Sequence, residues 1–126
     1  MIYFNANPMN RRTGDCVIRA FSVFLGTTWR KAFMELIEWC ADRGYVLFNY
    51  RSVYNRYLEE KGYKKTRAPF KGITVAQFVE FYAQEHNLYM LQCPRHVTII
   101  RDKELVDTWD CSHLEVQGFW IRKAEL

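Results

Sequence analysis

The apolar residues in the first two thirds of the chain recur at the three- and four-residue spacing of helices that face a core. The clearest such stretch runs from Cys16 to Leu25, where almost every residue is apolar and none is proline. It follows the polar segment Thr13-Gly14-Asp15 and is closed by Gly26, so Asp15 is a natural N-cap and Gly26 a natural stop. This pattern predicts a buried helix with Cys16 in its first turn.

Three further helices are predicted from the same spacing. Each begins near a hydroxyl residue, Thr28, Ser52 or Thr74, that can cap its first turn. The predicted ranges are 29–42, 53–62 and 75–85. Cys40 falls on the apolar stripe of the first of these helices, so we expect it in the core, and we expect Phe81-Tyr82 on the inner face of the last one.

After Asn87 the pattern changes to short β-branched and aromatic segments, which are typical of antiparallel strands. The segments are residues 88–92, 97–100, 105–109 and 116–122, with a further short strand at residues 2–4. Residues 101–104, Arg-Asp-Lys-Glu, predict a tight hairpin connection. Because several helices precede the sheet along the chain, we predict an α+β fold.

Composition adds limits to this picture. A chain of 126 residues that is 49% hydrophobic can bury a core as a single domain over residues 1–126. No apolar run approaches the roughly eighteen residues that cross a bilayer, and the first residues lack the basic and apolar regions of a signal peptide. We therefore expect a cytoplasmic protein with no membrane partner and with reduced cysteines. The net charge of +4 is modest, and the basic residues between Lys61 and Lys71 are typical of a solvated loop.

Cys16 is the first candidate for chemistry. A thiol in the first turn of a helix lies at the positive end of the helix dipole, where its pKa can fall well below the free value of about 8.5. This position is typical of a nucleophile. The alternative is that Cys16 fills the core beside Val17 and Ile18, since free cysteine is among the most buried residue types.

A cysteine nucleophile needs a base that takes its proton and a third group that orients the base. His96 opens one predicted strand and Asp107 lies on the next. If the turn between them has two central residues, His96 and Asp107 are diagonal neighbours on one face; with one more residue, Asp110 lies opposite His96 instead. The spacing leaves both arrangements open. A structural histidine, with Asp107 paired to Arg95 or Arg101, is a further alternative.

The order of these residues resembles the papain-like cysteine peptidase superfamily, and especially its compact microbial branches, the leader peptidases of peptide exporters and small phage-encoded relatives. The resemblance is carried by residues 13–20, Thr-Gly-Asp-Cys-Val-Ile-Arg-Ala, by residues 96–99, His-Val-Thr-Ile, and by residues 107–110, Asp-Thr-Trp-Asp. It covers the two ends of the chain. It implies a papain-like fold, in which N-terminal helices carry the nucleophile at a helix start and pack on a C-terminal antiparallel sheet.

The resemblance also implies roles for individual residues. Cys16 matches the nucleophile and His96 the base. Asp107 matches the orienting residue that precedes a covering tryptophan, here Trp109. Asn10, six residues before Cys16, stands where the family usually has an oxyanion-hole glutamine. The implied activity is hydrolysis of a peptide or isopeptide bond in a peptide or protein substrate through a thioester, with no cofactor.

Two other functions remain open from the sequence. Cys93, His96, Cys111 and His113 offer ligand types that suit zinc, so the chain could be a zinc-stabilised domain. Alternatively, a papain-like domain without activity could serve as a binding module for protein or nucleic acid. Nucleic acid is not the expected partner, because most of the aromatic side chains fall at core positions of the predicted helices and strands.

Overall fold

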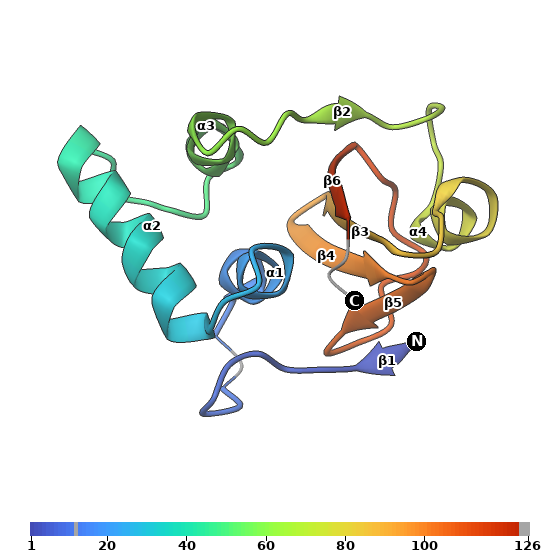
Figure 1. Cartoon of the computed structure of the whole chain (residues 1–126), viewed down its shortest axis with the longest axis horizontal. Coiled ribbons are helices and arrows are strands. Elements are labelled where there is room, and N and C mark those ends of the chain that lie inside the picture. Colours follow the sequence, from blue (N-terminus) through green and yellow to red (C-terminus); the bar gives the residue numbers. More distant parts are fainter. Residues whose placement is uncertain (12, 124–126) are drawn as a thin grey trace.

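The computed structural model describes residues 1–11 and 13–123 and has an α+β architecture with helices and one mixed sheet (Figure 1). The predicted α+β class is thereby confirmed. The helices are α1 (Cys16–Phe24), α2 (Trp29–Arg43), α3 (Arg51–Glu60) and α4 (Val75–Gln77), and α4 continues into a π-helical turn, η1 (Phe78–Tyr82). No helix in the described part of the chain is long and apolar enough to cross a membrane.

The helix starts show where local sequence rules apply and where they do not. α1 begins at Cys16 as predicted and is followed by Gly26 in the left-handed region at φ 67°. Asp15 occupies the N-cap position, but its side chain makes no capping bond. In α2, the Thr28 side chain accepts a hydrogen bond from the backbone N–H of Lys31, as a threonine cap should.

Two predictions about the later helices are wrong. α3 begins at Arg51 after Tyr50, so Ser52 lies inside the helix and does not cap it. The fourth helix does not continue to Glu85, because after a Thr74–Gln77 capping box the chain widens into η1 and leaves the helix at Ala83. The wider turn changes the direction of the side chains, and Phe81 is 68% exposed where an inner-face position was expected.

The sheet has the strand order β1-β5-β4-β3-β6-β2. Its strands are β1 (Ile2–Tyr3), β2 (Thr66–Arg67), β3 (Asn87–Cys93), β4 (His96–Arg101), β5 (Glu104–Asp107) and β6 (Gly118–Lys123). The β3–β4, β4–β5 and β3–β6 pairs are antiparallel, as predicted. β2 lies in the basic segment that was predicted to be a loop, and it pairs antiparallel with β6. β1 pairs with β5 in parallel, which the sequence did not predict, so the sheet is mixed.

Each face of the sheet has its own apolar core. One core joins α1, α2 and α3 to the sheet and includes Phe21, Leu36 and Trp120. Cys40 is buried in this core, as predicted. The other core joins α4 and η1 to the opposite face and includes Phe78 and Phe119. α1 lies directly against β4, so the start of this helix lies near the first residues of that strand.

Candidate active site

Cys16 is the first residue of α1, and its thiol is half-buried against the start of β4. Burial raises the pKa of this thiol, but a hydrogen bond to the His96 side chain and one from the backbone of Val97 lower it. The positive charges of His96 and Arg19 act in the same direction. The net effect is a pKa below the ordinary value, so the thiolate is favoured at this position.

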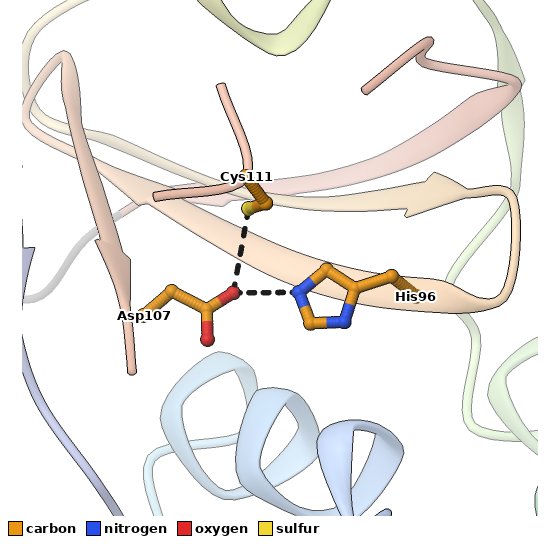
Figure 2. Close-up of side chains that lie close together, drawn as sticks. All are labelled: His96, Asp107 and Cys111. Atoms are coloured by element: carbon orange, nitrogen blue, oxygen red, sulfur yellow. Dashed lines mark hydrogen bonds and ion pairs between the residues drawn. The ribbon is translucent and has the colours of Figure 1, made fainter. Parts of the chain in front are cut away.

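His96 and Asp107 meet because the β4–β5 hairpin turns on two residues. Asp102 and Lys103 form the turn with φ angles of 51° and 61°, and the hairpin pairs Ile99 with Val106. His96 Nε2 lies 2.8 Å from Asp107 Oδ2, and both side chains are buried (Figure 2). Of the two predicted arrangements, the structure therefore has the shorter turn.

The other candidate partner, Asp110, faces away from this pair. It is exposed and accepts a hydrogen bond from the backbone N–H of Ser112 at 3.0 Å. Asp107 is therefore the carboxylate that is bonded to the His96 ring. Because Nε2 is bonded to Asp107, Nδ1 is the ring nitrogen left for the Cys16 thiol.

Asp107 is held by donors on both carboxylate oxygens. Thr98 Oγ1 donates to Oδ2 at 2.6 Å, and the backbone N–H of Thr108 donates to Oδ1 at 2.6 Å. Burial raises the pKa of Asp107, but the hydrogen bonds from His96 and Thr98 hold it below its ordinary value. Burial also lowers the pKa of His96, but its bonds to Asp107, Cys111 and Cys16 raise it well above the ordinary value. This environment favours an imidazolium between a carboxylate and a thiolate.

Arg19 connects this group to the start of α1. It is one turn after Asp15 and forms an ion pair with it, and its Nη2 lies 3.8 Å from Asp107 Oδ1. Asp15 is buried and also accepts hydrogen bonds from Asn7 Nδ2 at 3.1 Å and Trp29 Nε1 at 2.8 Å. Asp15 therefore ties α1 to α2 and to the N-terminal segment. The four-residue spacing of Asp15 and Arg19 was a sequence signal for this ion pair that we did not use.

Trp109 lies over His96, with ring centroids 5.0 Å apart, and is 42% exposed. The tryptophan that the resemblance implied thus lies beside the histidine and limits the access of water to it. Next to Cys16 is a cavity of about 20 Å³, lined in part by Arg19, Thr98 and Asp107. A cavity of this size holds about one water molecule.

Asn10 lies in an exposed turn of the N-terminal segment at φ 51°, and its backbone N–H donates to the carbonyl of Asn7. Its side chain makes no hydrogen bond to any residue that the structure describes, so its predicted place in an oxyanion hole stays a prediction. The asparagine that reaches the α1 start is Asn7, which the sequence reasoning missed.

The four predicted zinc ligands do not gather at one point. His113 is exposed, and its ring centroid lies 6.0 Å from that of Trp109. Cys93 is buried, and burial raises the pKa of its thiol to about 12. Within residues 1–11 and 13–123, the cluster with ligand atoms close enough to hold a metal is instead His96, Asp107 and Cys111. Cys111 Sγ lies 3.5 Å from Asp107 Oδ2 (Figure 2).

Comparisons with known proteins found no match to a family model, to a curated protein or to a solved structure.

Proposed function

We propose that this protein is a papain-like cysteine hydrolase that cleaves a peptide or isopeptide bond with Cys16 as nucleophile, His96 as base and Asp107 as orienting residue. One observation carries the proposal: His96 is bonded to Asp107 through Nε2 at 2.8 Å, and the same ring lowers the pKa of the thiol at the start of α1. A nucleophile, a base and an orienting group linked in this order are the arrangement that activates a thiol.

The proposed reaction begins with the Cys16 thiolate paired to protonated His96. The thiolate attacks the carbonyl carbon of the scissile bond, and we expect the backbone N–H of Cys16 at the helix start to stabilise the oxyanion. His96 Nδ1 then gives its proton to the leaving amine, which leaves a thioester on Cys16. Water, deprotonated by His96, releases the acid and restores the thiol. Asp107 keeps the ring oriented throughout by accepting a hydrogen bond from Nε2–H.

The pH dependence of alkylation tests this function directly. We expect iodoacetamide to modify Cys16 selectively at pH 6, because the thiolate is present there. In the His96→Ala variant, the rate at pH 6 should fall at least tenfold, because the group that lowers the pKa of the thiol is lost. Peptide mapping distinguishes Cys16 from Cys40, Cys93 and Cys111, which are buried and serve as internal controls.

A Cys16 that titrates like a free thiol near pH 8.5, with or without His96, would contradict the proposed hydrolase. That result would favour a papain-like domain that binds a partner without cleaving it.

A further inference from the structure

A second thiol, that of Cys111, lies beside the His96–Asp107 pair. The proposed reaction does not use this thiol. It is fully buried on the irregular segment between β5 and β6, and its Sγ donates to Asp107 Oδ2 at 3.5 Å. Figure 2 shows the thiol and the His96 ring directed at the same carboxylate oxygen from two elements. Nitrogen, oxygen and sulfur ligands thus converge on one small volume.

The spacing of these atoms suits a tetrahedral metal ion. Zn²⁺ bonds of about 2.0–2.3 Å to such ligands place the ligand atoms roughly 3.3–3.6 Å apart. Here the sulfur and the oxygen are 3.5 Å apart, the nitrogen and the oxygen 2.8 Å, and all three atoms lie within 4.8 Å of one another. The nitrogen–oxygen distance has to widen by about half an ångström to reach zinc geometry.

The surroundings support the same ion. Thr98 and the backbone of Thr108 fix the Asp107 carboxylate, which is how ligating carboxylates are usually oriented. A neutral imidazole, a carboxylate and a thiolate also balance the two charges of Zn²⁺, so the loaded site carries no net charge into a buried position. The mixed nitrogen, oxygen and sulfur set favours zinc over Mg²⁺ or Ca²⁺.

We propose that His96 Nε2, Asp107 Oδ2 and Cys111 Sγ form an inhibitory Zn²⁺ site. Binding releases the Nε2 proton of His96 and the thiol proton of Cys111. His96 then keeps its remaining proton on Nδ1. Because zinc holds Nε2, transfer of that proton to the leaving amine would leave an imidazolate instead of a neutral imidazole. Zinc therefore removes the general acid without touching the nucleophile. The inhibitory effect rests on the proposed hydrolase function, whereas the metal site does not.

The binding test uses Co²⁺ as a spectroscopic probe in a Cys16→Ser chain, where the nucleophile cannot supply a ligand. We expect one Co²⁺ per chain, a thiolate-to-cobalt charge-transfer band, and displacement of Co²⁺ by Zn²⁺. Adding Cys111→Ser should abolish the band, whereas adding Cys93→Ser, which removes a neighbouring buried thiol, should retain it. Circular dichroism confirms that each variant is folded. Absence of stoichiometric binding, or a band that survives Cys111→Ser, would overturn the site.

The inhibition test measures hydrolysis of a mixed peptide library and alkylation of Cys16 at pH 6, each with and without saturating Zn²⁺. We expect zinc to slow hydrolysis at least tenfold in the parent while alkylation continues, because the thiolate remains, and to have no effect on hydrolysis in Cys111→Ser. Persistence of the zinc effect in Cys111→Ser would show that the metal binds Cys16 itself, and it would overturn the inhibitory mechanism. If Cys16 is inert even without zinc, the hydrolase function fails, but the Co²⁺ spectrum still decides the metal site.

Discussion

At the scale of single residues, Arg19 connects the Asp107 carboxylate beside His96 with the Asp15 carboxylate at the start of α1. Its guanidinium lies between the buried carboxylates of Asp15 and Asp107 and contributes to the low pKa of the Cys16 thiol. Two buried carboxylates on adjoining elements would otherwise repel each other and destabilise the start of α1. We therefore expect Arg19 both to position the Asp107 carboxylate and to stabilise the start of α1.

We expect Arg19→Gln to raise the apparent pKa of Cys16 in an alkylation profile, but by less than His96→Ala does. It should also lower the free energy of unfolding by about 3 kcal/mol, since the Asp15 carboxylate loses its ion-pair partner. Arg19→Lys should restore part of the pKa shift, because the charge remains while the forked geometry is lost. Arg30→Gln, at an exposed position of α2, is the control and should change neither quantity. An unchanged Cys16 profile in Arg19→Gln would refute the role of this charge.

At the scale of elements, the β4–β5 hairpin sets the position of Asp107 relative to His96. Both central residues of its turn, Asp102 and Lys103, have left-handed φ angles, which is the requirement of the type I′ turn that matches strand twist. Aspartate tolerates this conformation, whereas lysine is disfavoured in it. The turn therefore keeps the register at a small cost in stability.

Lys103→Gly should raise the free energy of unfolding by about 1 kcal/mol, because glycine adopts a left-handed φ without strain. Chemical denaturation measures this change. The alkylation profile of Cys16 should remain that of the parent, since the turn length is kept. Lys103→Ala is the matched control, and an equal gain in stability from alanine would contradict the explanation by backbone strain.

The elements also show what the sequence could and could not predict. The start of α1, the span of α2 and the four later strands follow from local spacing and turn residues, which sequence patterns report well. The parallel pairing of β1 with β5 depends on packing between distant segments, so no local sequence pattern predicts it. The same holds for the site. The predicted hairpin left two aspartates, Asp107 and Asp110, as candidate partners of His96. Cys111, however, lies on an irregular segment, and no periodic pattern predicts its position.

At the scale of the whole molecule, the charges of the site make stability depend on pH. Asp107 has a folded pKa below 3.8, so its contribution is present above that pH and is lost as the pH falls through the folded value. His96 has a folded pKa raised above 6.5, so its contribution is complete below 6.5 and declines as the pH rises toward the folded value. The pair therefore stabilises the fold most between about pH 4 and 6.5.

We expect this window in the difference in unfolding free energy between a Cys16→Ser chain and the same chain with His96→Gln and Asp107→Asn. The Cys16→Ser background is needed because a thiol with a lowered pKa contributes with the opposite sign as the pH rises. The difference should decline above pH 6.5 by at most about 1.4 kcal/mol per pH unit. A difference that stays constant from pH 6 to 8 would show that folding does not raise the pKa of His96, and a difference that increases would show that His96 is neutral in the folded protein.

The proposed site is built from two distant segments of the chain, so its thiol can be activated only after these segments have packed together. His96 and Asp107 are eleven residues apart on one hairpin, and such hairpins form within microseconds. Cys16 comes from the other end of the chain and meets them only when α1 packs on β4. Its thiol consequently keeps ordinary reactivity during synthesis and early folding. Activation in the proposed site therefore requires α1 to be packed on the sheet, and local unfolding of either layer reverses it.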